Sequence, residues 1–288
     1  MSLRLRFWGT RGSIPSPGPL TARYGGNTPC VEVRGSDGRL VVLDAGSGIR
    51  SLGRWLADTA TGPLTADIVL THGHWDHIQG IPFFAPLFQK GNTIRIWGSD
   101  ALPRPIAEVI REQMGPVVFP VSFDDVAAKV EFCPISIGKT YNMGVRVSAM
   151  DVRHPGGALA IKITDKTGTA VYISDNELGS GGDTLAGASE TWRSDLVAFI
   201  KGAKVLIHDA TYSTEEYDLH RGWGHSTPEE TTELAIESGV EQLVLFHHKP
   251  DRTDDEVDAA VKRCEAIVRK SGAKMSVVAA AEGMTVFV

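Results

Sequence analysis

The sequence predicts an α/β fold in which two packed sheets carry helices on their outer faces, a layered sandwich. Hairpin-like runs of short strands come first along the chain, and strands alternate with helices later. The chain has 288 residues, of which 42% are hydrophobic, so it is long enough for a sizeable buried core. Because no linker or composition break interrupts it, we expect one domain over 1–288.

Strands are expected where β-branched and apolar residues cluster between glycine and proline turns. Several of these segments are short, and the turns between the first of them favour hairpins. The expected strands are 3–9, 29–34, 39–44, 66–70, 93–97, 129–134, 144–151, 158–164, 169–174, 204–208, 241–246 and 274–287.

The clearest helix is expected over 254–271, where apolar residues recur at helical spacing. Thr253 and Glu256 form a capping box at its start, and Gly272 follows its end. This pattern predicts a helix that packs one face against a sheet. A second helix begins after Thr227 and ends before Gly239. Further helices are expected at 48–58, 77–90, 104–115 and 190–201.

Composition excludes several classes of protein. The 29 Lys and Arg against 35 Asp and Glu give a net charge of −6, and no basic run is present, which disfavours extended nucleic acid as a partner. The three cysteines are widely separated, so neither a disulfide framework nor a thiolate metal site is expected. No apolar stretch approaches the roughly 20 residues of a membrane helix. The first residues lack a signal-peptide layout, which favours a cytoplasmic location. The Gly-rich segment 178–189 is expected to be a mobile loop.

The densest chemical feature follows the expected strand 66–70. His72, His74, Asp76 and His77 bring three imidazoles and a carboxylate into six positions. Imidazole nitrogen and carboxylate oxygen are ligands that zinc and similar divalent metals prefer, and such crowding is costly without a cation. The segment therefore predicts a metal site.

Further candidate ligands follow the ends of later strands, where functional residues often lie. They are His154, Asp175 and His247, with His248 as a rival for the last position. We choose His247 because it directly follows the apolar strand. With the first four residues, these give seven groups, enough for two metals that share a bridging carboxylate.

The segment Thr71-His72-Gly73-His74-Trp75-Asp76-His77 resembles the His-x-His-x-Asp-His signature of the metallo-β-lactamase superfamily of hydrolases. The likeness covers nearly the whole chain and includes Leu43-Asp44-Ala45-Gly46. It implies a four-layer αβ/βα sandwich with a dinuclear centre at the sheet edge. It further implies one metal on His72, His74 and His154, a second on Asp76, His77 and His247, and Asp175 as the bridge.

Two further segments, His208-Asp209-Ala210-Thr211-Tyr212 and Gly224-His225-Ser226-Thr227, are similar to the tRNA 3′-processing endonuclease and to cyclic-phosphate phosphodiesterases. In that branch an acidic residue orients a histidine that protonates the leaving oxygen. The resemblance assigns these roles to Asp209 and His225, and Asp76 would orient the attacking hydroxide. An imidazole supported by a carboxylate can donate such a proton near neutral pH.

The substrate is expected to be a small phosphodiester, cyclic nucleotides included. Asn176 to Ala203 holds only Arg193 and Lys201 as basic residues, so we expect the long basic arm typical of the tRNA endonucleases to be absent. Three alternatives stay open: a thioesterase or lactonase on the same centre, a tRNA 3′-processing-type endoribonuclease, and a non-catalytic metal or nucleotide sensor. Zinc is the first choice of metal, and manganese and iron accept the same ligands. The sequence leaves a homodimer open.

Trp75, Trp223 and Tyr212 flank the motifs. Each could stack on a base, a contact worth about 1–3 kcal/mol where it occurs. Core packing is the role we expect for them.

Overall fold

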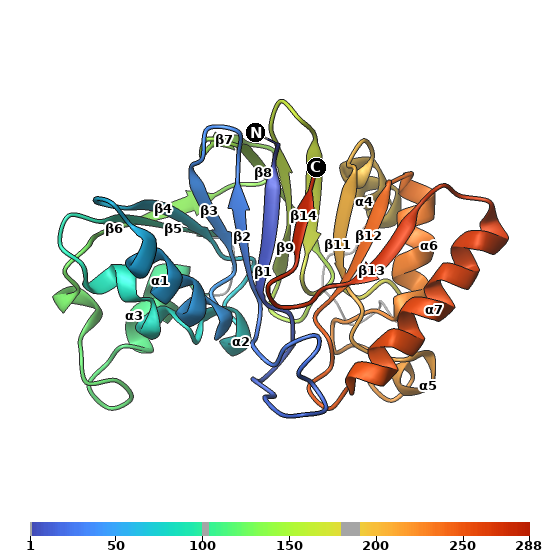
Figure 1. The fold of residues 1–288 in the computed structure, drawn as a ribbon, viewed down its shortest axis with the longest axis horizontal. Coiled ribbons are helices and arrows are strands. Elements are labelled where there is room, and N and C mark those ends of the chain that lie inside the picture. The colour runs from blue at the N-terminus through green and yellow to red at the C-terminus, as the bar shows by residue number, and fades with distance from the viewer. Residues whose placement is uncertain (1, 100–103, 180–190) are drawn as a thin grey trace.

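The computed structural model describes residues 2–99, 104–179 and 191–288. Within these ranges the chain forms two seven-stranded sheets that pack face to face, with helices on the outer face of each (Figure 1). This is the α/β sandwich that the sequence predicts. No helix in the described ranges is long and apolar enough to cross a membrane.

The first sheet combines antiparallel strands from the chain ends with parallel strands from the first half of the chain. Its alternating burial at Leu3, Leu5 and Phe7 shows the period-2 pattern of a strand with one face on the core. In spatial order the strands are β14 (Thr285–Phe287), β1 (Arg4–Gly9), β2 (Cys30–Arg34), β3 (Leu40–Leu43), β4 (Thr65–Val69), β5 (Thr93–Ser99) and β6 (Lys129–Ile135).

The second sheet is built from the second half of the chain. Parallel pairs join its later strands, and antiparallel pairs join its earlier ones. In spatial order the strands are β13 (Ser276–Ala279), β12 (Gln242–Phe246), β11 (Val205–Asp209), β10 (Thr169–Ile173), β9 (Ala158–Thr164), β8 (Arg146–Val152) and β7 (Thr140–Asn142).

Helices cover both outer faces (Figure 1). Beside the first sheet lie α1 (Gly48–Thr59), α2 (Trp75–Ile78) and α3 (Ile106–Glu112), with the 3-10 helices η1 (Ile81–Phe83), η2 (Ala85–Phe88) and η3 (Phe123–Asp125). Beside the second sheet lie α4 (Trp192–Ile200), α5 (Thr214–Tyr217), α6 (Pro228–Ser238) and α7 (Asp254–Ser271).

Among the described residues, three apolar clusters hold the layers together. One fills the space between the two sheets and includes Phe7, Tyr172 and Phe246. The second lies under α4, α6 and α7, and the third lies under α1 and α3. Burial of apolar surface in these layers is the main force that fixes the two sheets relative to each other.

The predicted ends of the two best-marked helices are confirmed. Thr227 and Thr253 each accept a hydrogen bond from the backbone N–H three residues later, which completes both capping boxes. Gly239 and Gly272 end these helices in the left-handed conformation, with φ of 70° and 74°. Glycine adopts this conformation without the steric cost that a Cβ atom imposes.

Two expected elements are wrong in detail. The segment 77–90 is not one helix, because Pro82 and Pro86 each lie in the first turn of a separate 3-10 helix and supply no backbone N–H for a continuous helix. The segment 274–287 is not one strand, since it divides into β13 and β14, which belong to different sheets. A turn at Gly283, with φ of 83°, separates them.

Three short elements of the described chain were not expected, β7, α5 and η3. The expected mobile loop 178–189 lies largely outside the described residues, since 180–190 are not described.

Candidate metal centre

The predicted ligands gather at one edge of the sandwich, where strands of both sheets end. His72 follows β4 of the first sheet, while His154, Asp175 and His247 follow β8, β10 and β12 of the second. Because the carboxyl ends of the parallel strands point to the same edge, residues more than 170 positions apart come into contact there, as His247 and Asp76 do.

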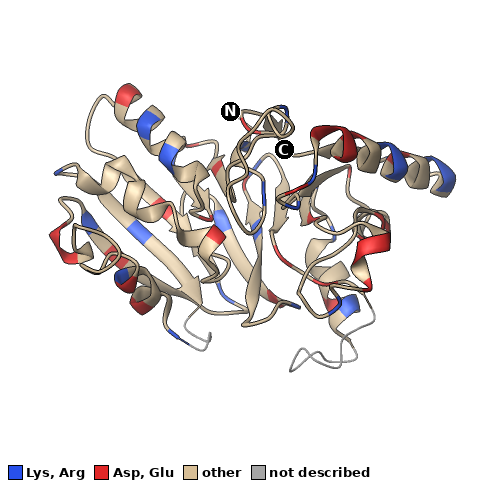
Figure 2. Cartoon of the chain, turned by 90° about the horizontal axis from the view of Figure 1, so that it is seen from below, with Lys and Arg blue, Asp and Glu red and all other residues tan. Residues whose placement is uncertain are grey.

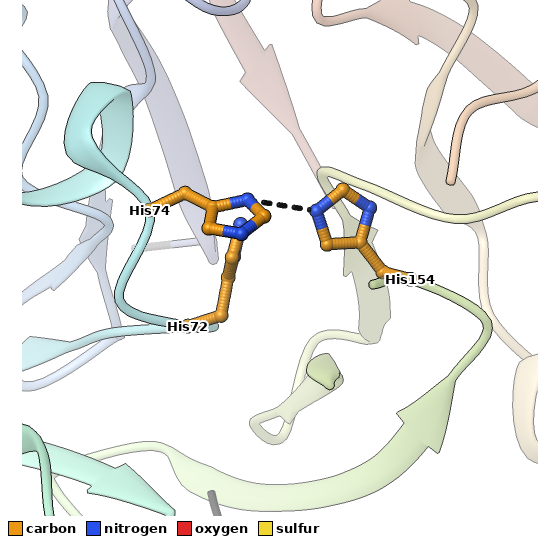
Figure 3. A group of neighbouring side chains, drawn as sticks. All are labelled: His72, His74 and His154. Atoms are coloured by element: carbon orange, nitrogen blue, oxygen red, sulfur yellow. Dashed lines mark hydrogen bonds between the residues drawn. The ribbon is translucent and has the colours of Figure 1, made fainter. Parts of the chain in front are cut away.

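His72, His74 and His154 form the first group (Figure 3). One ring nitrogen from each lies within 4.8 Å of the others, and Figure 3 shows the three rings turned toward one another. His154 Nε2 is 2.9 Å from His74 Nδ1. His72 and His154 are buried, whereas His74 is exposed, so the group is open to solvent on the His74 side.

Asp76, His77 and His247 form the second group. Asp76 Oδ2 is 3.2 Å from His77 Nε2 and 3.1 Å from His247 Nε2. All three side chains are buried. The backbone N–H of Ser13 also donates to Asp76 Oδ2 at 2.7 Å, which fixes the carboxylate from the amino-terminal loop.

Asp175 lies between the two groups. Its Oδ1 is 3.1 Å from His77 Nε2, and its Oδ2 is 3.3 Å from His247 Nε2. The same Oδ2 is 3.8 Å from His154 Nε2 and 3.9 Å from His72 Nε2. One carboxylate therefore reaches imidazoles of both groups, which is the position that a bridging ligand requires.

His247 and His248 point in different directions. His247 Nε2 faces Asp76, while His248 Nε2 donates to the carbonyl oxygen of Ala280 at 2.9 Å. Burial lowers the pKa of His248 to about 4, so its ring is neutral at pH 7. The geometry thus places His247, the residue chosen from the sequence, in the cluster.

The polar atoms at the centre fit a bound cation. His72 Nε2, His77 Nε2 and Asp175 Oδ1 are buried and make no hydrogen bond to any part of the chain that the structure describes. The last two atoms are 3.1 Å apart, but without hydrogen-bond geometry. Buried polar atoms without partners are costly, and a metal ion coordinated by them removes that cost.

The pKa shifts of the clustered side chains also fit a bound cation. Burial lowers the pKa of His72 well below its ordinary range and that of His154 to about 4, which leaves both rings neutral and able to bind metal. Burial opposes ionisation of Asp175, yet His247, His77 and His72 hold its pKa well below the ordinary value. Burial disfavours the charged ring of His77, but Asp175, Asp76 and Asp44 raise its pKa well above the ordinary value. Neutral imidazoles such as those of His72 and His154, together with a carboxylate, are donor types that divalent metals favour.

Asp209 and His225 form a pair beside this cluster. His225 Nδ1 donates to Asp209 Oδ2 at 2.8 Å, and the His225 ring lies 4.9 Å from that of His247 and 5.3 Å from that of His154. Burial disfavours the charged ring, but the Asp209 charge and hydrogen bond, helped by Asp175, raise the pKa of His225 to about 9. By distance alone, His225 could also join a ligand group with His154 and Asp175.

The sequence pointed to Asp44 only as part of a motif, without a role. Asp44 Oδ2 accepts a hydrogen bond from His77 Nδ1 at 2.9 Å and another from the Tyr172 hydroxyl at 2.8 Å. This hydrogen bond holds His77 Nδ1 and so directs His77 Nε2 toward the cluster. Metal-ligating histidines usually have such a partner on their other ring nitrogen. Its position directly after an apolar strand was the available signal.

The carbonyl of Gly224 and the hydroxyl of Thr211 were missed. They contact His154 Nδ1 at 2.9 Å and His247 Nδ1 at 3.0 Å respectively. Nothing in the sequence marks a backbone carbonyl as such a partner.

Core packing was the wrong expectation for two of the three flanking aromatics. Trp75 is 63% exposed and Trp223 is 59% exposed, whereas Tyr212 is buried as expected. Each tryptophan adjoins a residue that contacts the His154 ring, namely His74 and Gly224. Both tryptophans are therefore exposed residues that adjoin the site in sequence.

Residues 39–248 match the family model of the β-lactamase superfamily domain. Ribonuclease Z of Bradyrhizobium sp. (strain ORS 278) is 28% identical, over 90% of this chain and 93% of that protein. The metallo-β-lactamase fold protein YhfI of Bacillus subtilis has a TM-score of 0.72 at 18% identity and covers 99% of this chain and 98% of its own. Yeast PDE1 has a TM-score of 0.71 at 14% identity and covers 100% of this chain and 99% of its own.

The two structural likenesses show a shared fold. The family model covers well over half of the chain and spans all the predicted metal ligands. Together with the histidine and aspartate cluster at the sheet edge, these comparisons show that the chain belongs to the metallo-β-lactamase superfamily of metal-dependent hydrolases.

Proposed function

We propose that the protein is a dinuclear metal-dependent phosphodiesterase that hydrolyses a small phosphodiester. The observation that carries this proposal is the Asp209–His225 pair, which lies in contact with the metal-ligand cluster. An alkoxide leaving group needs a proton, and thiolates or other stabilised leaving groups need it much less. The pair is therefore most useful for cleavage of a phosphodiester with a poor leaving group.

The two ligand groups would hold one divalent metal ion each, with Asp175 shared between them, and zinc is our first choice. When bound, such ions polarise a phosphoryl oxygen and lower the pKa of water toward neutrality. Around them, Asp44 orients His77, Gly224 orients His154, and Asp76 would hold and orient the attacking water. The last role follows from the position of Asp76 between His77 and His247.

His225 would act as the general acid. Its Nδ1 is engaged by Asp209, which leaves Nε2 to carry the proton that passes to the departing oxygen. A pKa of about 9 means that the ring is protonated at neutral pH in the absence of cations. A ring that carries its proton at neutral pH can pass it to the departing oxygen.

A small substrate is supported by the distribution of charge. The net charge is −6, and Figure 2 shows acidic and basic residues intermingled along the described ribbon. The helix α7 begins with Asp254, Asp255 and Glu256, and its basic residues, among them Arg269 and Lys270, come later in the helix. A protein that grips a long polyanion usually presents a continuous basic face. A single domain located in the cytoplasm is part of the same proposal.

Processing of tRNA 3′ ends is the second candidate, because the similar protein of Bradyrhizobium is named ribonuclease Z. The salt dependence of activity distinguishes the two candidate functions. Affinity that depends on many phosphate contacts falls steeply as salt rises, whereas turnover of a small diester should change little. We expect weak salt dependence with a small diester and poor cleavage of precursor tRNA at physiological salt. Efficient tRNA cleavage under those conditions would establish the endonuclease instead.

The proposal is tested with two leaving groups in the metal-replete protein. His225→Ala should reduce kcat by about 100-fold to 10,000-fold with an alkoxide leaving group, the range for general acid catalysis. With p-nitrophenolate the loss should be much smaller, because that group leaves without a proton. Asp209→Asn should show the same pattern in weaker form, since it weakens support for the imidazolium and leaves the acid in place.

Metal content is measured in each variant as the control. Equal losses with both leaving groups, at unchanged metal content, would remove His225 as the general acid and favour a thioesterase or lactonase. Loss of metal would make His225 a ligand. A protein that binds metal and hydrolyses none of the diesters, thioesters or lactones offered would be a sensor.

A further inference from the structure

We infer that an apolar recess beside the first ligand group binds the organic group of the diester that stays on the phosphorus, and that this group is a single uncharged ring. The inference rests on the proposed phosphodiesterase function and adds the substrate class to it. It would make Ile106 and Val109, on α3, determinants of specificity.

The recess has a volume of about 190 Å³ and opens next to His72 and His74. Ile106 and Val109 form one side of it, and the backbone of Gly73, Gly156 and Gly157 forms much of the rest. Ile106 belongs to the apolar cluster under α3, and Val109 packs against that cluster, so this wall is firmly held. The recess thus joins a rigid apolar surface to the open side of the ligand group.

Glycine keeps the recess open. A Cβ atom on Gly73 would lie 3.6 Å from Ile106 Cδ1 and 3.7 Å from Val109 Cγ1, in ordinary contact with both, so any larger side chain there would fill the space. A Cβ atom on Gly156 would lie 3.8 Å from His74 Nε2. The two backbone segments that carry ligands His74 and His154 therefore both present a surface without side chains at this point.

The recess is suited to an uncharged group. Arg104 is its one cationic residue among those described, and its guanidinium already forms ion pairs with Glu112 at 2.6 Å and with Glu108 at 3.4 Å. A second phosphate or a carboxylate would compete with these partners and would lose hydration against an apolar wall. A single aromatic ring gains from burial there and can lie flat against the glycine backbone.

The position of the recess assigns it to the ester group that stays on the phosphorus. His154 lies between His74 and His225, with ring centroids 4.8 Å and 5.3 Å from them. The recess is on the His74 side, and neither His225 nor Asp209 lines it. The leaving oxygen must face the acid His225, so the other ester group is directed toward the recess. At about 190 Å³ the space suits one ring and is smaller than typical pockets for larger ligands.

The experiment compares phenyl p-nitrophenyl phosphate with methyl p-nitrophenyl phosphate. Both release p-nitrophenolate, so they differ only in the group that stays on the phosphorus. Val109→Phe places a ring in the recess, and we expect the ratio of kcat/KM for the phenyl over the methyl diester to fall at least about tenfold. That is the low end of the discrimination that an apolar pocket achieves for one methylene group.

Ala107→Phe is the matched control, because it adds the same ring to α3 at a position that does not line the recess. Its phenyl-to-methyl ratio should equal that of the wild type. Val109→Ala is the second variant, and it should raise kcat/KM for a 1-naphthyl diester relative to the phenyl diester by enlarging the recess.

The outcomes separate the two proposals. If metal-replete wild-type protein hydrolyses neither diester, the phosphodiesterase function itself fails. If it hydrolyses both, but Val109→Phe and Ala107→Phe leave the ratio equally unchanged and Val109→Ala brings no gain with the naphthyl diester, the recess does not bind the retained group and the function stands.

Discussion

The carbonyl oxygen of Gly224 accepts a hydrogen bond of 2.9 Å from His154 Nδ1. Gly224 directly precedes His225, so the residue that orients a metal ligand also fixes the backbone of the candidate general acid. Buried Glu177 holds this segment in turn, since it accepts hydrogen bonds from the backbone N–H groups of Gly222 and Gly224 at 2.9 Å. The candidate metal site and the candidate acid are thus positioned by one loop.

Gly224→Ala should therefore disturb both the orientation of His154 and the position of His225. Gly224 has φ of 85°, and a Cβ atom there would lie 2.2 Å from His154 Nδ1, so the imidazole must move. We expect metal content to fall by about one ion per chain and activity to fall with it, as measured by elemental analysis and diester hydrolysis. Gly202→Ala is the matched control, because φ is 84° and nothing lies within 4 Å of the added carbon. Equal effects of the two substitutions would show that backbone strain alone is responsible.

Asp175→Ala should lower the metal content from about two ions per chain toward one. Asp175 is the carboxylate that reaches imidazoles of both groups, and its loss would leave two cations close together without a shared anion. Elemental analysis after reconstitution and thermal unfolding of the metal-free protein are the two measurements. An unchanged stoichiometry would remove Asp175 from the site, and one ion or fewer in the wild type would refute a dinuclear centre.

Asp44→Asn should weaken metal binding by about 10-fold to 100-fold, the usual effect of removing a partner that orients a metal ligand. Asp44 binds His77 Nδ1 and is itself held by the Tyr172 hydroxyl. The amide keeps the size of the side chain but removes its charge. Metal affinity is measured by competition with a chelator. Tyr172→Phe removes only the hydrogen bond from the Tyr172 hydroxyl to Asp44 and should lower metal affinity less. A larger loss in that variant would contradict the role given to Asp44.

Glu216→Gln should make the protein less stable at pH 7 but not in acid. Burial opposes ionisation of Glu216, yet Lys249, the backbone of Ser213 and Arg252 lower its pKa to about 2. A carboxylate whose pKa is lowered on folding stabilises the fold above its unfolded pKa of about 4.5, and the contribution is lost as pH falls toward 2.

The expected loss in unfolding free energy at pH 7 is about 1.5 kcal/mol, the low end for hydrogen bonds to charged groups. Denaturant unfolding of both proteins between pH 7 and pH 2 tests this. The difference between wild type and variant should shrink steadily below about pH 4.5. A difference that stays constant across this range would show that the charge of Glu216 contributes nothing.

Local patterns were sufficient for most of the elements. The capping boxes at Thr227 and Thr253 and the glycines after both helices marked their ends, because capping depends on residues within one turn of the terminus. Prolines in 77–90 and the turn at Gly283 carried the information that these segments are interrupted, but the apolar pattern outweighed it in the prediction. Membership of β13 and β14 in different sheets is decided by packing partners far away in the chain.

The site also combines features that a local sequence pattern predicts with features that depend on residues far apart in the chain. The run from His72 to His77 predicts a metal site without knowledge of the fold, because its residue types suit divalent metals and lie within six positions. Which later residues complete this site depends on how distant strands pack together. His247 faces the cluster and His248 faces Ala280, although both follow the same strand, because consecutive side chains point in different directions. The support from Asp44 and Gly224 and the recess beside His74 likewise exist only once the two sheets pack together, since each is made by residues that are distant in the chain.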